Sequence, residues 1–156
     1  MNTERGIRYF PIGLFASVMG FAGVGIAIKQ ADHLYEIGNI ASSIVVALTT
    51  LLFLFYSVVF IYRMIRYGED VKNDFQHPVK MNFFAAISIS LLLLSVLYFE
   101  MSRSLSLGLF FIGSALQLSL TMVILSKLIW RQSFHVAQFN PAWFIPIVGN
   151  IIVPLA

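Results

Sequence analysis

The most constraining feature of this chain is a set of four long stretches without ionisable side chains. They cover residues 9–28, 37–62, 81–99 and 104–126, so each is 19 to 26 residues long. About 20 helical residues cover roughly 30 Å, the thickness of the hydrocarbon core of a bilayer. Each stretch therefore predicts one complete transmembrane helix.

A fifth apolar stretch covers residues 141–156, but its uninterrupted apolar part begins only at Phe144 and is too short to span a bilayer. The first stretch follows Arg5 and Arg8, as a signal peptide would. Its apolar core is longer than that of a signal peptide, which indicates a retained span. The sequence thus predicts an all-α, polytopic membrane protein of helical hairpins. We expect residues 1–156 to form a single transmembrane domain, with an incomplete fifth helix, that is a fragment of a longer protein.

Composition excludes several function classes. Hydrophobic residues make up 59% of the chain and charged residues 11%, against about 25% charged residues in soluble domains. A scattered net charge of +3 does not suit a nucleic-acid surface, so no nucleic-acid partner is expected. The chain has no cysteine, and His33, His77 and His135 lack metal-ligand spacing. We expect no metal site, no cofactor and no catalytic residues, because no nucleophile–base or paired-carboxylate pattern is present.

The basic residues predict an orientation. Eight of the ten lysines and arginines fall at the N-terminus, between the second and third stretches, or after the fourth; only Lys29 and Arg103 lie on the other side. Because cytoplasmic segments are enriched in Lys and Arg, we expect a multi-pass protein of the inner or plasma membrane with a cytoplasmic N-terminus.

Small residues follow one face of the first stretch. At 100° per residue, an arc of about 120° holds most of its glycines, alanines and its serine: Gly13, Ala16, Ser17, Gly20, Gly23 and Ala27. Such a stripe suits close packing of helices in lipid, or it borders a conduit. Gly25 lies off the arc and is expected to tolerate alanine.

Polar residues also recur in the later stretches. Asn82, Ser88 and Ser95 share roughly one face of the third, which suits a wall that faces water. Ser43, Thr50 and Ser57 in the second, and Ser106, Gln117 and Thr121 in the fourth, are expected to bond within their own helix or to a neighbour. No carboxylate, lysine or histidine is expected deep within these four spans, which favours passive permeation over a proton relay.

Three motifs at helix starts carry a family resemblance: Phe10-Pro11-Ile12-Gly13, the run His77-Pro78-Val79-Lys80-Met81-Asn82-Phe83-Phe84, and Asn140-Pro141-Ala142-Trp143-Phe144 continuing to Val148-Gly149-Asn150. In order and spacing they resemble the tellurite-resistance/dicarboxylate transporter family, which includes plant slow anion channels. The resemblance implies a ten-helix ring in which odd-numbered helices line a central pore, with trimers of such subunits. This chain would supply the N-terminal half, without the family's gating phenylalanine.

The motifs and the small stripe together give the candidate pore-lining residues: Phe10, Gly13, Ser17, Gly20, Asn82, Ser88, Ser95, Gly149 and Asn150. Asn150 also suits an interhelical contact, because an unpaired amide in hydrocarbon is costly. Lys80, Arg8 and Lys127 are expected to attract anions into a cytoplasmic vestibule. Lys80 replaces an arginine common in the family, and it also suits an anchor to lipid phosphate.

These observations leave three functions open. The first is an anion channel, or channel-like transporter, that moves small anions or organic acids through an apolar pore. The second is a proton-coupled transporter of dicarboxylates, sulfite or tellurite-type oxyanions. The third, which applies if the chain is complete, is a non-conducting membrane interaction protein. The expected partners are the lipid bilayer, a small anion and further copies of the chain.

Overall fold

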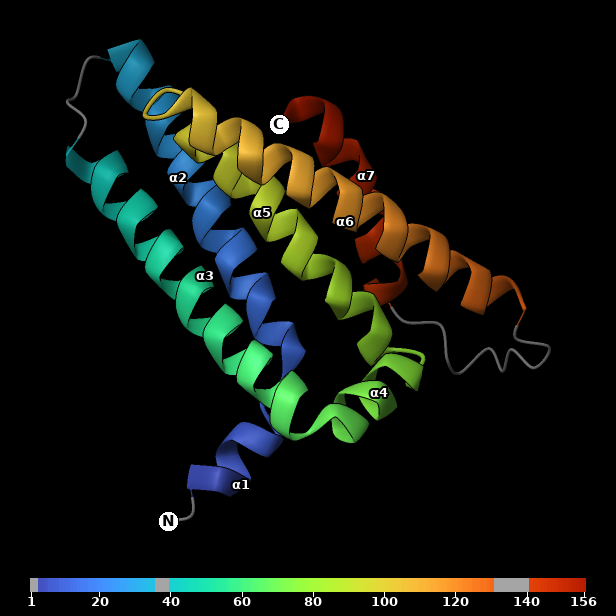
Figure 1. Cartoon of the computed structure of the whole chain (residues 1–156). Coiled ribbons are helices and arrows are strands. Elements are labelled where there is room, and N and C mark those ends of the chain that lie inside the picture. Colours follow the sequence, from blue (N-terminus) through green and yellow to red (C-terminus); the bar gives the residue numbers. More distant parts are fainter. Residues whose placement is uncertain (1–2, 36–39, 131–140) are drawn as a thin grey trace.

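The computed structural model describes residues 3–35, 40–130 and 141–156, and the regular elements of these ranges are all helices (Figure 1). Their bounds are α1 Thr3–Arg8, η1 Ile12–Leu14, α2 Phe15–Tyr35, α3 Ile40–Arg66, α4 Gly68–Gln76, η2 Lys80–Phe84, α5 Ala85–Tyr98, α6 Arg103–Ile129, η4 Pro141–Phe144, α7 Ile145–Ile152 and η5 Val153–Leu155, where η marks a 3-10 helix.

Four helical segments of the described part of the chain are long and apolar enough to cross a membrane. They are Ile12–Tyr35, Ile40–Arg66, Lys80–Tyr98 and Arg103–Lys127, and Pro141–Ile152 is a shorter apolar helix. The predicted all-α, polytopic fold class, with four complete spans and a shorter fifth, is confirmed.

The first span is longer than the charge-free stretch that predicts it. Helix α2 continues through Lys29, Asp32 and His33 to Tyr35. The Nζ of Lys29 donates a hydrogen bond to the Leu97 carbonyl at 2.7 Å. This carbonyl lies at the C-terminal end of α5, where the helix dipole favours a cation. Charged residues at a helix end can remain helical at the membrane boundary, so absence of charge marks the apolar core of a span rather than its ends.

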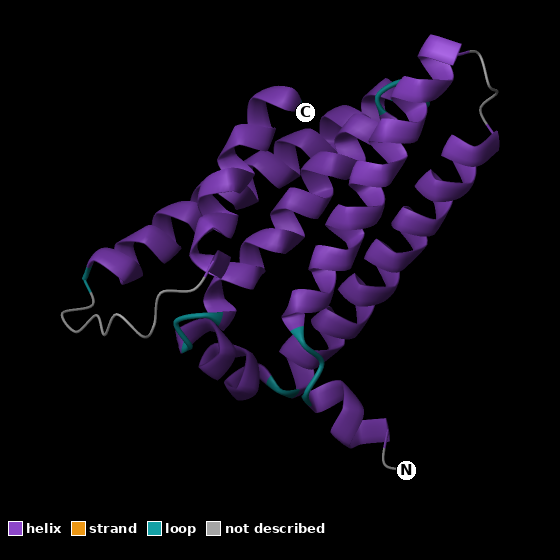
Figure 2. Ribbon diagram, turned by 180° about the vertical axis from the view of Figure 1, so that it is seen from behind, coloured by secondary structure: helices purple, strands orange, loops and turns teal. Residues whose placement is uncertain are grey.

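The helices form two groups around α5 (Figures 1 and 2). Helix α5 lies between α2 and α7, while α3 packs on α2, and α6 packs on α5 and α7. In the most apolar part of the Lys80–Tyr98 span, which contains α5, 67% of the residues are buried, against 28% in the Ile12–Tyr35 span and less in the α3 and α6 spans. Helix α5 is therefore the central helix of the bundle.

Aromatic rings form the core at the end of the bundle that carries α4. The ring of Phe15 is fully buried and meets Phe53, Tyr56 and Phe60 of α3 at centroid distances of 5.9 to 6.2 Å. These edge-on contacts are a favoured geometry of aromatic pairs. They join α2 to α3 directly above the most charged part of the chain.

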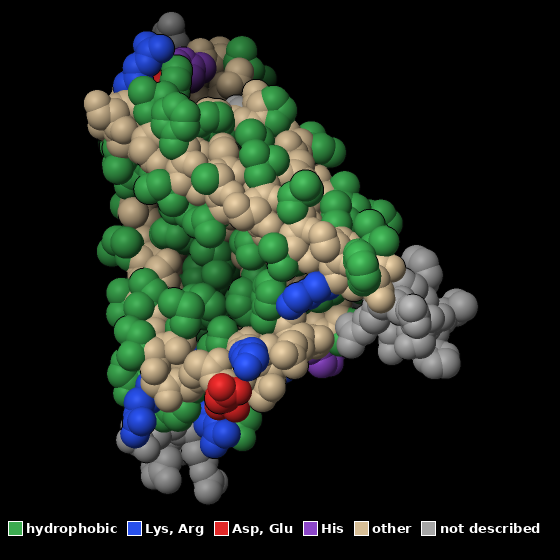
Figure 3. All heavy atoms as spheres, turned by 45° about the vertical axis from the view of Figure 1, so that its right-hand side comes forward, with side chains coloured by type: hydrophobic (Ala, Val, Ile, Leu, Met, Phe, Trp, Pro, Cys, Tyr) green, Lys and Arg blue, Asp and Glu red, His purple; other side chains and the backbone are tan. Residues whose placement is uncertain are grey.

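The outer surface is strongly apolar, as Figure 3 shows for one face. Large hydrophobic side chains such as Phe55, Ile65 and Phe111 are more than half exposed. A soluble domain rarely exposes continuous apolar surface of this extent. The surface therefore suits lipid.

Candidate functional site

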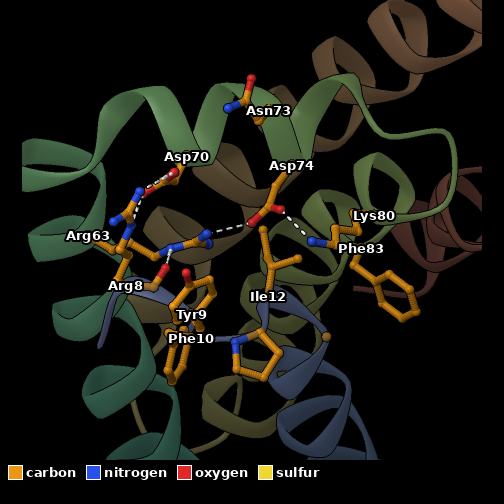
Figure 4. A pocket seen from close by; sticks show the side chains of 12 residues that line it. Arg8, Tyr9, Phe10, Ile12, Arg63, Asp70, Asn73, Asp74, Lys80 and Phe83 are labelled. Carbon is orange, nitrogen blue, oxygen red and sulfur yellow. Dashed lines mark hydrogen bonds and ion pairs between the residues drawn. The ribbon is translucent and has the colours of Figure 1, made fainter. Parts of the chain in front are cut away.

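A cavity of about 350 Å³ opens where the end of α1, η1, the end of α3, α4 and η2 meet (Figure 4). Three cationic side chains and two carboxylates share its wall with apolar residues of the first motif. Its lining residues are Arg8, Tyr9, Phe10, Pro11, Ile12, Gly13, Arg63, Asp70, Asn73, Asp74, Lys80 and Phe83. We call this cavity the mouth. It brings together two predicted pore-lining residues, Phe10 and Gly13, and two predicted vestibule residues, Arg8 and Lys80.

Asp74 is the electrostatic centre of the mouth. One carboxylate oxygen accepts a hydrogen bond from Arg63 Nη2 at 2.6 Å, and the other accepts one from Lys80 Nζ at 2.7 Å. Partial burial raises the pKa of Asp74, but the hydrogen bonds from Lys80 and Arg63 outweigh it and hold the pKa below its usual value. The carboxylate therefore stays ionised between two cations.

Arg63 is the buried member of this group, with a side chain only 4% exposed. Its Nε donates to the Arg8 carbonyl oxygen at 2.9 Å, which ties the end of α3 to the end of α1. Its Nη1 has no hydrogen-bond partner among the described residues. A buried guanidinium with a spare donor is a strong local source of positive potential.

Arg8 and Asp70 form a second, more exposed pair at the rim. Arg8 Nε lies 2.8 Å from Asp70 Oδ2, and Arg8 Nη2 lies 3.4 Å from Asp70 Oδ1. The hydrogen bond from Arg8 lowers the pKa of Asp70, and the same contact raises the pKa of Arg8. Three cations against two carboxylates leave the mouth with one net positive charge.

Lys127, the third predicted vestibule residue, does not line the mouth. Its Nζ lies over the ring of Phe75, 3.9 Å from the centroid, at the end of α6. This cation–π contact places its charge close to α4 but outside the cavity where Arg8 and Lys80 meet.

The small stripe of α2 faces open space in the structure. A Cβ atom on Gly20 or Gly23 would meet no atom within 4 Å, and Gly13, at the mouth end, would meet only the Phe83 ring at 3.7 Å. Ser17 is half-buried and bonds back to the Leu14 carbonyl. Within the described part of the chain no atom packs against Gly20 or Gly23, so close packing against further protein and the border of a conduit both stay predictions.

Gly25 behaves in the opposite way, and the expected tolerance of alanine there requires that its neighbours shift by a few tenths of an ångström. A Cβ on Gly25 would lie 3.1 Å from Leu97 of α5 and 3.3 Å from Val45 of α3. The tight contact face of α2 thus runs through Gly25, Ala22 and Val18, all of which are buried.

The polar line of α5 is buried between helices. Asn82, Ser88 and Ser95 have no exposed surface. Asn82 donates to the Pro78 carbonyl at 2.9 Å, and Ser88 donates to Gln117 of α6 at 2.6 Å. The Oδ1 atom of Asn82 has no partner among the described residues. A role for these three residues in a pore wall stays a prediction.

Gln117 forms a polar node, which confirms the expectation that it bonds to a neighbouring helix. Its amide accepts from Ser88 and donates to the Pro146 carbonyl at 2.8 Å. Asn150 joins from α7, where its Nδ2 donates to Thr121 Oγ1 at 3.2 Å. A Cβ on Gly149 would clash with the Gln117 amide, so glycine permits this approach of α7 to α6. The bonds satisfy the Gln117 amide, which would be costly to leave unpaired within an apolar span.

The opposite end of the bundle carries a second titratable group. Glu100 accepts from His33 Nε2 at 2.7 Å and lies 3.4 Å from Lys29 Nζ, while Asp32 of the same helix end is buried. The hydrogen bond from His33 lowers the pKa of Glu100. Placing span ends at the first charge hid this group, because Lys29, Asp32 and His33 belong to the last turns of α2.

No group of three or more His, Asp or Glu side chains in the described ranges is arranged to hold a metal ion. His135 and Asn140 lie outside those ranges.

Comparison with known proteins gives the context of this geometry. The model of the voltage-dependent anion channel family matches residues 9–156. An uncharacterised transporter of Methanocaldococcus jannaschii is 26% identical over 152 residues, which cover 96% of this chain and 44% of that protein. A tellurite resistance protein homologue of Haemophilus influenzae is 22% identical over 151 residues, 96% of this chain and 46% of that protein.

An S-type anion channel of Arabidopsis thaliana is 27% identical over 92 residues, which cover 56% of this chain and 18% of that protein. The chain thus spans less than half the length of these curated relatives. The family match, in contrast, includes all four long spans, α7 and every residue that lines the mouth except Arg8. The chain belongs to the voltage-dependent anion channel family.

Proposed function

We propose that this chain supplies the entrance and one wall of a pathway for small anions across the membrane. The observation that carries the proposal is the continuity of two features. The mouth has a net positive charge, and its residue Gly13 precedes α2, on which the open positions Gly20 and Gly23 follow. An anion drawn to the mouth would meet a surface without bulky side chains.

The mouth would act mainly by electrostatics. Arg63 is fixed by Asp74 and by the Arg8 carbonyl, so its spare donor contributes positive potential without side-chain reorganisation. Asp74 and Asp70 offset part of the cationic charge. An anion is thereby attracted without being bound too tightly to leave, which conduction requires. Selectivity against cations would follow from this potential, and selectivity among anions from the cost of dehydration in the apolar section.

The proposed orientation puts the mouth on the cytoplasmic side of the inner or plasma membrane. The mouth holds Arg8, Arg63 and Lys80, and Arg66 and Lys72 lie on the segments beside it. The opposite end carries Lys29 and Arg103. This asymmetry supports a cytoplasmic N-terminus.

The wall opposite α2 is proposed to come from further protein. The open stripe has no covering helix in the described ranges, and the relatives are more than twice as long as the matched region. Additional transmembrane segments, in subunits that assemble as trimers, would enclose the pathway and make it continuous.

The proposed cargo is a small monovalent anion or an organic acid such as a dicarboxylate. The test is a reversal-potential measurement on the intact protein in planar bilayers, with a gradient of chloride, nitrate or malate salt. Anion permeation predicts a reversal potential near the equilibrium potential of the anion. A potential that follows the cation gradient, or a lack of current with all three anions, would contradict the proposal.

A proton-coupled carrier is the second candidate, and the group at the far end of the bundle favours it. Asp32 is buried, and its Oδ2 has no partner among the described residues, while the adjacent His33 shares a hydrogen bond with Glu100. Intramembrane titratable groups often mark proton relays. In proteoliposomes without an anion gradient, a pH gradient alone would drive anion uptake by a carrier but not by a channel.

A further inference from the structure

An apolar groove of about 300 Å³ lies on the outer side of the bundle between α3 and α6. Ser57, Phe60 and Met64 line it from α3, Leu116 and Leu120 from α6, and Phe84 lies at its base. Figure 3 looks onto a face of the molecule where hydrophobic side chains line a hollow and Lys and Arg side chains gather along its lower side. The groove lies outside the mouth described above.

A basic and aromatic site adjoins one end of this groove. Lys127 lies over the Phe75 ring, Phe75 packs edge-on against Phe84 at 4.9 Å, and Phe84 lines the groove. Lys127 also shares a surface cavity with Gln76, Met81 and Trp130. Among the described residues, Lys127 forms no ion pair. Its charge is thus available to an external anionic group.

The spacing along α6 places the cation and the groove in one line. Leu116, Leu120 and Lys127 fall within about 40° of one another at 100° per residue, and a rise of 1.5 Å per residue puts Lys127 about 16 Å from Leu116. The α6 span ends at Lys127, which is the level of lipid head groups. Trp130 next to it has the amphipathic character that favours this interface.

We propose that this site binds one anionic phospholipid of the leaflet at the mouth end. Its phosphate contacts Lys127, with the Gln76 amide and the Trp130 indole beside it, and one acyl chain lies in the groove between α3 and α6. Charge complementarity selects an anionic head group, and the nearly apolar lining accepts the chain.

The dimensions of the groove favour an acyl chain over a protein helix. A helix with side chains is about 10 to 12 Å across, so about 300 Å³ would hold only two or so residues of one. The hydroxyl of Ser88 at the groove is already bonded to Ala85 and Gln117, so it offers no free donor to a peptide. A flexible hydrocarbon chain needs none.

The head-group half of the proposal is tested by native mass spectrometry of the intact protein with added phosphatidylglycerol or phosphatidylcholine. A basic residue near an anionic lipid surface is worth about 1 kcal/mol, which corresponds to about a fivefold preference for phosphatidylglycerol. Lys127→Gln should remove that preference. Arg103→Gln is the matched control, because Arg103 lies over Phe99 at the opposite end of the same helix, and it should leave the preference unchanged.

The groove half is tested by filling the cavity. Ser57→Phe should abolish retention of the tightly bound lipid with either head group. Ser119→Phe, on the exposed side of α6, should not. Thermal unfolding and size-exclusion chromatography establish that each variant is folded.

Three outcomes would overturn the proposal. The first is equal phosphatidylglycerol preference in wild type and Lys127→Gln, and the second is full lipid retention in Ser57→Phe. The third is a lipid-free wild-type oligomer that Ser57→Phe converts to a monomer, which would make the groove a contact between copies of the chain. The readout is lipid binding, so the result is independent of whether the proposed anion pathway is correct.

Discussion

Helices α2 and α5 are both rich in small residues, yet the structure uses them in opposite ways. In α5, Ala85, Ala86, Ser88, Ser90 and Ser95 have no exposed surface. In α2, Gly20 and Gly23 meet no neighbouring atom within 4 Å. Small residues let helices approach closely in lipid. In the described part of the chain, helices pack against the small residues of α5 but not against Gly20 and Gly23 of α2.

The position of each helix in the bundle explains the difference. Helix α5 contacts α2, α6 and α7, whereas α2 packs mainly on α3 and α5 through its Val18, Ala22 and Gly25 face. The other face of α2 is free for a solute or for further protein. A small-residue stripe therefore does not separate packing from conduction until the neighbours of each face are known.

The sharpest way to break this comparison is to place leucine on each face of α2. Gly25→Leu introduces a side chain where the Cβ alone is already within 3.1 Å of Leu97. Overpacking of this kind costs about 1 to 3 kcal/mol, so thermal stability should fall clearly. Gly20→Leu should retain wild-type stability. Equal destabilisation by both substitutions would show that the stripe is packed rather than open.

A second prediction concerns the buried polar side of α5. Gln117→Leu removes the acceptor of Ser88 and one donor to Pro146 while keeping a similar volume. Ser88 can still bond to Ala85, so the cost should be about 1 kcal/mol, near the upper range for hydrogen bonds between membrane helices. The readout is the midpoint of thermal unfolding. Ser119→Ala on the exposed side of α6 is the control, and a Gln117→Leu protein as stable as that control would contradict a structural role for the node.

The mouth is lined by η1 and η2, the 3-10 helices that precede α2 and α5, so its charged residues allow a test of the electrostatic part of the account. Lys80→Gln should reduce anion entrance from the mouth side a few-fold, with the largest effect at low salt, where the Debye length is about 30 Å at 0.01 M. Asp74→Asn should increase it by a similar factor, because Lys80 and Arg63 lose their shared counter-charge. The measurement is the anion flux of the wild type and both variants at several ionic strengths. Changes of the same sign in the two variants would argue against electrostatic attraction.

The smallest expected effect is the pH dependence of stability that comes from Asp74 of α4. Because contacts lower the pKa of Asp74 in the folded state, its contribution is present above the ordinary value of 3.8 and is lost as pH falls through the lowered value. The unfolding midpoint of wild type should therefore decrease below about pH 4. Asp74→Asn should show a shallower decrease. Parallel curves for the two proteins would mean that the Asp74 contacts do not contribute.

The spans and the fold class were predictable because charge-free length is a direct consequence of bilayer thickness. The end of α2 was not, since Lys29 remains helical by donating to the Leu97 carbonyl of another helix. A single sequence does not show which carbonyl will be close to it. The same reason hid the burial of Gly25, whose neighbours lie on α3 and α5.

The sequence predicted some of the residues that line the candidate site, but not the ion pairs between them. Arg8 and Lys80 were recognised by their place at helix starts, and both line the mouth. Arg63 was missed as a site residue, because it lies at the end of a span where basic anchors are common. Its burial and its bond to Asp74 depend on how α4 turns at the end of α3, which the sequence pattern does not specify.

The most direct test of the account is anion flux through the intact protein carrying Gly20→Leu. Gly20 lies on the open face of α2, so the leucine has room in the fold but would occupy the proposed pathway. Proteoliposome chloride flux should fall sharply while the unfolding midpoint stays at the wild-type value. Unchanged flux in a stable Gly20→Leu protein would contradict the claim that this face of α2 is a wall of the anion pathway.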